Sequence, residues 1–131
     1  MVKGVRLPED RRVKTIAVDF DGVIHAYSRG YLDGSIYDEP ADGAIDALRE
    51  LMEDYAVFIF TARDVLSVAA WLHERGFRVV TENPTEPVWK IQGILLVTQT
   101  KYVAEIYIDD RGLRFEDWDQ TLADVKRLVK S

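Results

Sequence analysis

Two pairs of carboxylates, each placed directly after a largely apolar run, constrain this chain more than any other feature. The pairs are Asp19 with Asp21, after residues 16–18, and Asp109 with Asp110, after residues 106–108. A short apolar run of this kind predicts a buried strand of a parallel sheet. Ligands of open α/β sheets bind beyond the carboxyl ends of the strands, so we expect the four carboxylates to converge there. Their mutual repulsion favours a hard divalent cation between them, most simply Mg²⁺.

Length and composition fit a single folded domain over residues 1–131. Of the 131 residues, 47% are hydrophobic, which is ordinary for a globule with one core. The chain has no cysteine, which excludes disulfides and sulfur-based zinc sites. A formal net charge of −6 disfavours non-specific nucleic-acid binding. No stretch approaches the ~20 apolar residues of a membrane span, so we expect a soluble, cytoplasmic protein without a membrane partner.

Strand patterns and helix patterns alternate along the chain. Strand-like runs occur at 15–18, 56–60, 77–80, 105–108 and 113–115, and helix-like spacing follows Asp42, Asp64 and Asp119. We expect Asp42 and Asp64 to be the N-caps of their helices. This alternation predicts a three-layer, doubly wound, Rossmann-like α/β fold with a mostly parallel sheet. Residues 23–39 lack a sustained period and predict a flap beside the first acidic pair. Residues 82–100 stay open between a lid and an extra strand, with 94–97 a candidate neighbour of strand 56–60.

The residues at the predicted strand ends resemble the four motifs of the haloacid dehalogenase-like superfamily, whose members are mostly phosphatases and phosphotransferases. Residues 19–23 resemble the first motif, Thr61 the second, Lys101 the third and Asp109-Asp110 the fourth. The resemblance covers nearly the whole chain. It implies a Mg²⁺-dependent phosphomonoesterase that works through an aspartyl-phosphate. The gaps between the motifs are too short for an inserted cap domain, so we expect a small member without a cap.

The resemblance implies a distinct role for each aspartate. An aspartate carboxylate can attack phosphorus to form an aspartyl-phosphate, and Asp19 fits that role. Asp21 would protonate the leaving oxygen and later activate water, while its backbone carbonyl binds Mg²⁺. Asp110 would ligate Mg²⁺ directly, and Asp109 would act through water or by holding the ligands in place.

Phosphate binding is expected from Thr61, Ala62, Arg63 and Lys101. The Thr61 hydroxyl and the backbone N–H groups at the start of the next helix would cradle the phosphate. Lys101 would supply a positive charge to the transferring phosphoryl group. Lys90 is a rival lysine, farther along the chain from the last acidic strand. Arg63 fits a structural ion pair as well as binding of peripheral substrate groups.

The residues that surround the predicted site are less specific. His25 lies four residues after Asp21 and fits either a pocket position or simple packing. We expect residues 25–40 and 84–93 to form the rim of the site and to decide which substrate enters. Trp89 and the tyrosines of the flap would stack on a substrate ring there, although core packing explains them equally well.

A second function class stays open, namely a non-catalytic or receiver-like phospho-acceptor module. Receiver domains also place Asp, Thr and Lys around Mg²⁺ on a doubly wound sheet. Their acidic pair lies on the first strand and their acceptor Asp in mid-chain, whereas here Asp19 comes first and the acidic pair last. A small molecule, a nucleotide and a phosphorylated macromolecule all stay open as the phosphorylated substrate, and so does a homo-oligomeric state.

Overall fold

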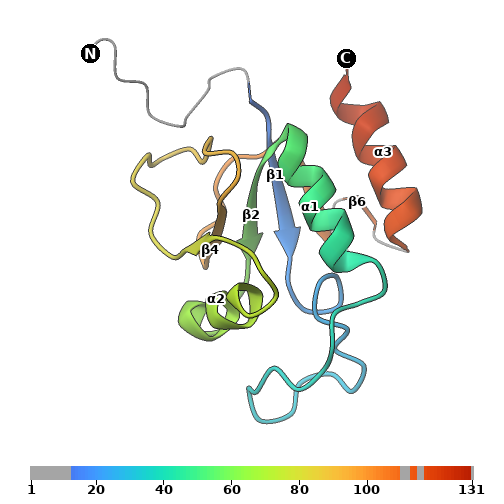
Figure 1. The fold of residues 1–131 in the computed structure, drawn as a ribbon, viewed down its shortest axis with the longest axis vertical. Coiled ribbons are helices and arrows are strands. Elements are labelled where there is room, and N and C mark those ends of the chain that lie inside the picture. The colour runs from blue at the N-terminus through green and yellow to red at the C-terminus, as the bar shows by residue number, and fades with distance from the viewer. Residues whose placement is uncertain (1–12, 110–112, 115–116, 131) are drawn as a thin grey trace.

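The computed structural model describes residues 13–109, 113–114 and 117–130 and has an α/β fold with one parallel sheet (Figure 1). Its strands are β1 (Thr15–Asp19), β2 (Ala56–Phe60), β3 (Val79–Val80), β4 (Leu95–Thr98), β5 (Ile106–Asp109) and β6 (Leu113–Arg114). Its helices are α1 (Ala44–Asp54), α2 (Val65–His73) and α3 (Trp118–Lys130). Every strand pairing is parallel, in the order β3-β4-β2-β1-β5-β6.

The centre of the sheet is formed by β1 and β2, which are apolar almost throughout. All residues of both strands are buried except the last of each, and the register runs from Thr15↔Ala56 to Asp19↔Phe60. Strands that are covered on both faces have this unbroken apolar pattern. Residues 95–97 belong to β4, which pairs with β2. The run that was a candidate neighbour of strand 56–60 is therefore a strand beside it.

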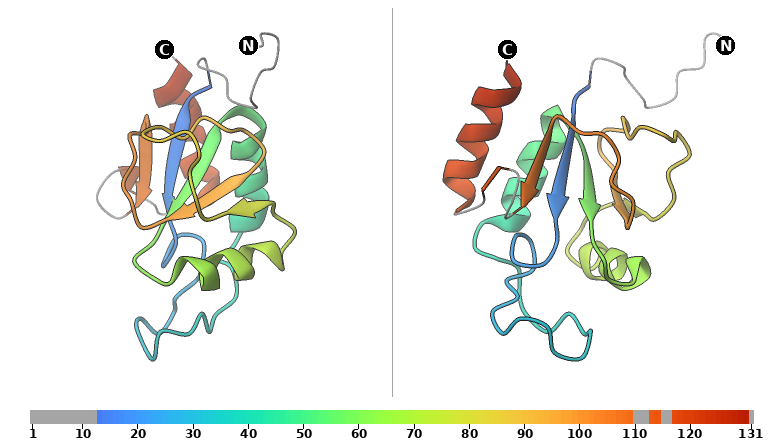
Figure 2. Two further views of the ribbon diagram at one scale, coloured as in Figure 1. Left: turned by 90° about the vertical axis from the view of Figure 1, so that its left-hand side faces the viewer. Right: turned by 180° about the vertical axis from the view of Figure 1, so that it is seen from behind.

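All three helices pack on one face of the sheet. Residues of α1, α2 and α3 share one core cluster with Ile16 and Val18 of β1 and with Val57 and Ile59 of β2. These strand residues alternate along their strands and therefore point to the same face. Figures 1 and 2 show α1 and α3 next to each other over this face, and the two helices are in contact.

The opposite face of the sheet is covered by irregular chain. Trp89 and Ile91 pack there against Ala17 and Phe58 in a second core cluster. Residues 81–94, drawn as a loop in Figure 2, contain two prolines, and proline disfavours the formation of a helix. The described residues therefore place no helix on this face, and the predicted three-layer, doubly wound arrangement is not confirmed.

The starts of the helices test the predicted caps. The Asp64 carboxylate accepts a hydrogen bond from the backbone N–H of Ser67 at 3.1 Å, so the predicted cap of α2 is confirmed. The prediction that Asp42 caps α1 is wrong, because Gly43 occupies that position with φ of 77°. Glycine adopts this left-handed conformation without a steric cost. None of the helices in the described ranges is long and apolar enough to cross a membrane.

The strand order contains a reversal between β1 and β5. The chain that leaves β1 returns as β2 on one side, whereas the chain that leaves β5 forms β6 on the other side. In open α/β sheets such a reversal leaves a crevice at the carboxyl ends of the two strands. The fold therefore directs attention to the last residues of β1 and β5, which are Asp19 and Asp109.

Candidate functional site at the carboxyl ends of the strands

Asp19 and Asp109 end two adjacent parallel strands. The register Val18↔Ile108 makes them the next pair along β1 and β5, so their backbones lie roughly 5 Å apart. Like charges on adjacent strands repel each other. One Asp19 oxygen also accepts a hydrogen bond from the N–H of Phe20 at 3.0 Å. The pair is therefore suited to a positive partner.

Lys101 lies on the same face of the sheet as this pair. Its Nζ is 5.2 Å from the ring centre of Phe60 and 5.6 Å from that of Tyr107. Both rings pack with the second core cluster, on the face without helices. By the alternation of side chains along β1 and β5, Asp19 and Asp109 point to that face as well. The loop that bears Lys101 therefore brings its charge to the correct side of the sheet.

Tyr107 links this loop to the acidic strand. Its hydroxyl donates to the backbone carbonyl of Tyr102 at 2.8 Å, which ties the segment after Lys101 to β5. Burial, and secondly the charge of Asp109, raise the pKa of Tyr107 above its ordinary value. The hydroxyl therefore stays protonated and keeps this hydrogen bond at neutral pH.

Thr61 follows β2 and is buried in the turn that leads to α2. Its backbone N–H donates to the carbonyl of Thr98, and its hydroxyl oxygen accepts from the N–H of Arg63, both at 3.0 Å. The hydroxyl proton is left for a further acceptor. Gln99, which sequence reasoning missed, also holds the turn, because its side chain donates to the Arg63 carbonyl at 2.9 Å. The Arg63 N–H predicted to cradle phosphate already has Thr61 as a partner.

Asp21 is the centre of a hydrogen-bond network. The Nε of Arg63 donates to both its carboxylate oxygens, at 2.9 and 2.8 Å, and the Nδ1 of His25 lies 2.9 Å from Oδ1. The Nε2 of His25 accepts from the backbone N–H of Asp38 at 3.0 Å. This second bond assigns the proton of a neutral His25 to Nδ1, so the imidazole donates to Asp21. Arg63, a candidate substrate ligand in the sequence, thus makes the structural ion pair.

The flap, residues 23–39, folds back over this network. Tyr37 accepts a hydrogen bond from the N–H of Arg29 at 2.9 Å and donates to the carbonyl of Gly30 at 2.7 Å. Ser28 donates to Asp38 from its hydroxyl at 2.6 Å and from its backbone at 2.9 Å. These bonds, the hydroxyl first, lower the pKa of Asp38 below its ordinary value. The flap is therefore an ordered loop that is anchored through polar contacts.

Only some of the residues predicted to hold the metal ion belong to the part of the chain that the structure describes. Carboxylates on adjacent strands are the hard oxygen ligands that Mg²⁺ prefers, and Asp19 and Asp109 supply them. Within the described ranges, no group of three or more His, Asp or Glu side chains is arranged to hold a metal ion. Asp21 is predicted to ligate Mg²⁺ through its backbone carbonyl, while its side chain is engaged by Arg63 and His25. Asp110, the predicted direct ligand, lies outside the described residues.

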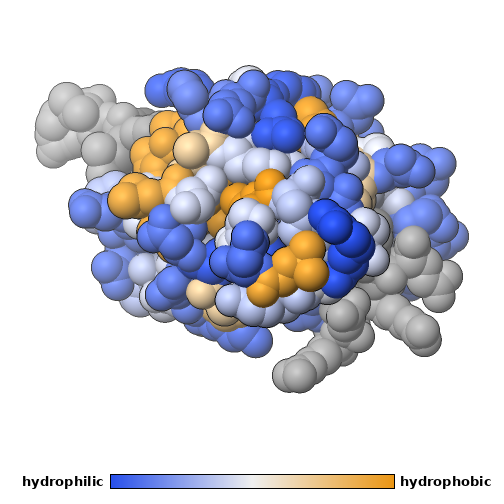
Figure 3. Space-filling model, turned by 90° about the horizontal axis from the view of Figure 1, so that it is seen from below, coloured by the Kyte–Doolittle hydropathy of each residue, from blue (hydrophilic) through white to orange (hydrophobic). Residues whose placement is uncertain are grey.

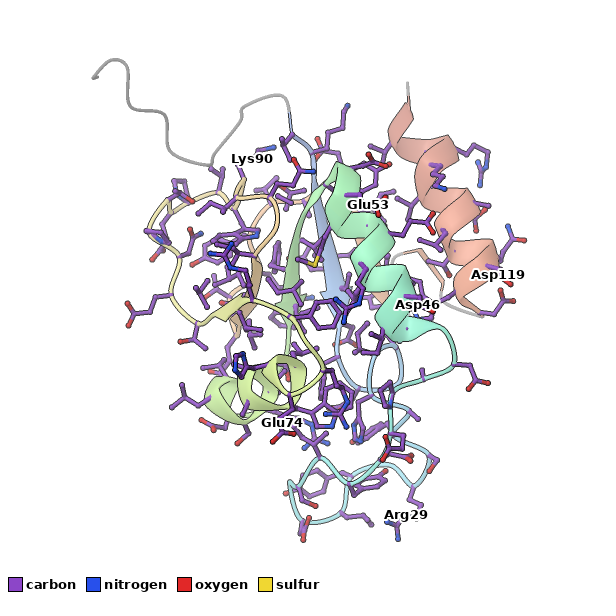
Figure 4. All side chains as sticks on the ribbon, viewed as in Figure 1. Arg29, Asp46, Glu53, Glu74, Lys90 and Asp119 are labelled. Atoms are coloured by element: carbon purple, nitrogen blue, oxygen red, sulfur yellow. The ribbon has the colours of Figure 1, made fainter. Side chains whose placement is uncertain are left out.

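Two residues suggested for the site lie at the opposite end of the sheet. Trp89 is fully buried; its indole donates to the carbonyl of Val57 at 3.0 Å, and its own carbonyl accepts from Thr15 at 2.7 Å. Lys90 donates to the carbonyl of Val13 at 2.8 Å. All three partners lie before a strand or within its first two residues, and Figure 4 shows Lys90 far from Arg29 of the flap. The prediction that Trp89 belongs to the rim is wrong, because its ring is needed to fill the second core.

The molecular surface at this edge is mixed in character. Figure 3 looks onto the carboxyl ends of the strands and shows hydrophobic side chains in separate patches among polar ones. Tyr31 of the flap and Leu66 of α2 are among the exposed large hydrophobic residues of the described chain.

The comparisons of this chain with family models, curated proteins and solved structures found no match.

Proposed function

We propose that the protein is a Mg²⁺-dependent phosphomonoesterase, a small capless relative of the haloacid dehalogenase-like superfamily with a doubly wound core. The observation that carries the proposal is that Asp19 and Asp109 end adjacent parallel strands at the reversal of strand order. Lys101 on the same face and Thr61 at the end of the neighbouring strand add a cation and a hydroxyl donor. This combination suits a reaction in which a negatively charged phosphoryl group is bound and transferred.

The reaction proposed has two steps. An Asp19 oxygen attacks phosphorus and the ester oxygen departs with a proton from Asp21, which leaves an aspartyl-phosphate. Asp21 then removes a proton from water, which attacks phosphorus and returns Asp19 to a carboxylate. Lys101 balances the charge of the phosphoryl group throughout. Mg²⁺, when bound through Asp19, the Asp21 carbonyl, Asp109 and Asp110, would neutralise the carboxylates and the phosphate together.

The network around Asp21 supports a positioned acid-base group. Arg63 and His25 hold its carboxylate from two directions, so the group is fixed before a substrate arrives. Pre-set geometry of this kind contributes strongly to catalysis, because small displacements of a catalytic group slow the reaction. Asp21 must accept a proton, and with it loosen the contact to Arg63, before it serves as an acid.

The two first-motif aspartates provide the decisive test. The Asp21→Asn protein, mixed with an activated phosphate ester and Mg²⁺, should gain the mass of one phosphoryl group, because Asp19 still reacts while hydrolysis of the intermediate is slowed. The Asp19→Asn protein should gain none. Intact-mass spectrometry reads both outcomes. Equal labelling of the two variants would refute Asp19 as the nucleophile.

The metal has an independent test. Calorimetric titration of the unliganded protein with Mg²⁺ should show one site, and Asp110→Ala should abolish it. Asp46→Ala, which removes an exposed carboxylate of α1, is the matched control and should leave binding unchanged. Equal Mg²⁺ binding by Asp110→Ala and the natural protein would place the ion elsewhere.

One observation favours a second candidate, a receiver-like phospho-acceptor. Asp21 receives hydrogen bonds from Arg63 and His25, and an acid-base group that stayed locked in this way would leave an aspartyl-phosphate unhydrolysed. The two functions differ in turnover. A phosphatase releases many equivalents of both alcohol and phosphate from an activated ester, whereas an acceptor module releases about one equivalent of alcohol and retains the phosphoryl group.

A further inference from the structure

A pocket of about 470 Å³ lies between the flap and the start of α2. The lining residues used below are Asp21, Tyr27, Tyr31, Gly34, Arg63 and Asp64. We propose that this flap pocket binds a planar, uncharged aromatic ring carried by the leaving group of the substrate. The inference rests on the proposed function, and it narrows the substrate class to monophosphate esters of aryl alcohols or nucleosides.

The position of the pocket follows the chemistry of Asp21. In the proposed reaction Asp21 protonates the ester oxygen, so the remainder of the leaving group must lie beside this carboxylate. Asp21 is itself part of the pocket wall. A volume of about 470 Å³ is within the range of small-molecule sites, which starts near 300 Å³. The pocket therefore has the place and the size required for a ring joined to the reacting oxygen.

Tyr27 presents a fixed aromatic wall. Its ring packs 5.7 Å from His25 and 6.4 Å from Tyr37, and the Arg63 guanidinium lies 5.6 Å from its centre. Its backbone has a φ of 56°, and within the described chain it is the one residue other than glycine with positive φ. A bulky residue takes this conformation at a steric cost that its surroundings must offset. The flap thus accepts local strain at a residue of the pocket wall.

Tyr31 presents a second, open aromatic wall. It is 72% exposed, although an aromatic ring gains free energy when it leaves water. A planar ligand that stacks on it would cover this surface. Such stacking on aromatic side chains is a favourable contact for every base in nucleic-acid complexes. The Tyr31 ring is therefore the part of the pocket with most to gain from an aromatic occupant.

The charged groups of the pocket favour a neutral ring over a second anion. Arg63 is the cation of the pocket wall, and it is committed to Asp21 and, through Nη1, to the carbonyls of Gly34 and Ser35 at 2.7 and 3.3 Å. Asp64 uses Oδ2 to cap α2. A second phosphate on the leaving group would meet carboxylates without a cation to spare. Monophosphate esters should therefore be preferred to diphosphates and triphosphates.

The test uses alcohols without phosphate, so it does not depend on catalysis. The full chain, labelled with ¹⁵N, is titrated with adenosine, with 4-methylphenol and with cyclohexanol as a non-aromatic control, and binding is followed by amide chemical shifts. We expect saturable shifts of flap amides and of residues 62–64 with at least one aromatic ligand and none with cyclohexanol. The tighter aromatic ligand identifies the leaving group as a nucleoside or an aryl alcohol.

Substitutions of Tyr31 test whether the aromatic ring of the ligand stacks on this side chain. Tyr31→Leu should weaken aromatic binding about tenfold, whereas Tyr31→Phe should remain within about twofold of the natural protein. Leu128→Ala on α3, which also removes exposed apolar surface, is the control and should have no effect. Equal binding of cyclohexanol, unchanged affinity in Tyr31→Leu, or no saturable shift up to the solubility limit would each overturn the proposal. Failure of the Asp19 labelling experiment would leave ring binding intact, so the two hypotheses fail separately.

Discussion

The Nε of Arg63 donates to both carboxylate oxygens of Asp21, at 2.9 and 2.8 Å, although the two residues are 42 positions apart in the chain. The same guanidinium donates through Nη1 to the carbonyl of Gly34 at 2.7 Å. Arg63 therefore joins the first acidic motif, the start of α2 and the flap. A single side chain links the orientation of the proposed acid-base group to the position of the flap.

Replacing Arg63 by Gln should release this coupling. Asp21 would lose a charged partner, and we expect kcat/KM for an activated ester to fall about 10²-fold because the carboxylate is no longer held in place. Arg29→Gln is the control, since Arg29 lies on the same flap and stacks on Tyr37 without contacting Asp21. Steady-state kinetics distinguishes the two variants. Equal losses in both would mean that Arg63 acts only through general flap stability.

His25→Phe should destabilise the fold, because His25 is fully buried and bonded through both ring nitrogens. The phenyl ring keeps the aromatic packing but leaves the Asp38 N–H without its acceptor. We expect the free energy of unfolding to fall by about 1–3 kcal/mol in urea denaturation. His73→Phe makes the same change at an exposed position and should change this free energy by less than about 0.5 kcal/mol. A silent His25→Phe would show that these hydrogen bonds do not stabilise the fold.

The flap should loosen in acid. Hydrogen bonds from Ser28 lower the pKa of Asp38, and those from Ser35 lower that of Asp33. Groups with a lowered folded pKa stabilise the fold fully above the ordinary carboxyl pKa of about 3.9, and this contribution is lost as pH falls through the lower folded pKa. The amide signals of Ser28 and Ser35 should therefore shift below about pH 4. An Asp38→Asn protein whose Ser28 signal shows the same transition would contradict the assignment.

Trp89 should behave as a core residue. Its ring is fully buried and its indole nitrogen is satisfied by Val57. Trp89→Ala should lower the free energy of unfolding by about 3–5 kcal/mol. Tyr31→Ala, at an exposed position of the flap, should cost less than about 0.5 kcal/mol. A KM change without a stability loss in Trp89→Ala would return this residue to the rim.

Lys101 and Lys90, the two candidate lysines, should differ in role, the first acting in catalysis and the second in stability. Lys101→Gln removes the cation on the face of Asp19, so kcat for ester hydrolysis should fall about 10²-fold or more while stability is nearly unchanged. Lys90→Gln removes a hydrogen bond to the Val13 carbonyl and should cost about 1 kcal/mol of stability without lowering kcat. Kinetics and thermal unfolding of both proteins give the comparison. A larger kcat loss in Lys90→Gln would reverse the assignment.

Much of this fold could be predicted from local sequence. The runs that form β1, β2 and β5 are short and largely apolar, and an acidic or hydroxyl residue stands at or directly after the end of each run. In β1 and β2 the apolar pattern reflects burial on both faces of the sheet. The Asp64 cap could also be predicted, because it depends on residues only three positions apart. The sequence therefore determined that Asp19, Thr61 and Asp109 stand at strand ends.

Tertiary structure alone decided which of these ends meet and what surrounds them. The partner of Arg63, the place of Lys101 over Phe60 and Tyr107, and the burial of Trp89 all join segments far apart in the chain. The helices share one face of the sheet, and the irregular chain around Trp89 fills the other. Such contacts depend on the paths of loops, and a loop's path is set by the surfaces it covers rather than by its own periodicity.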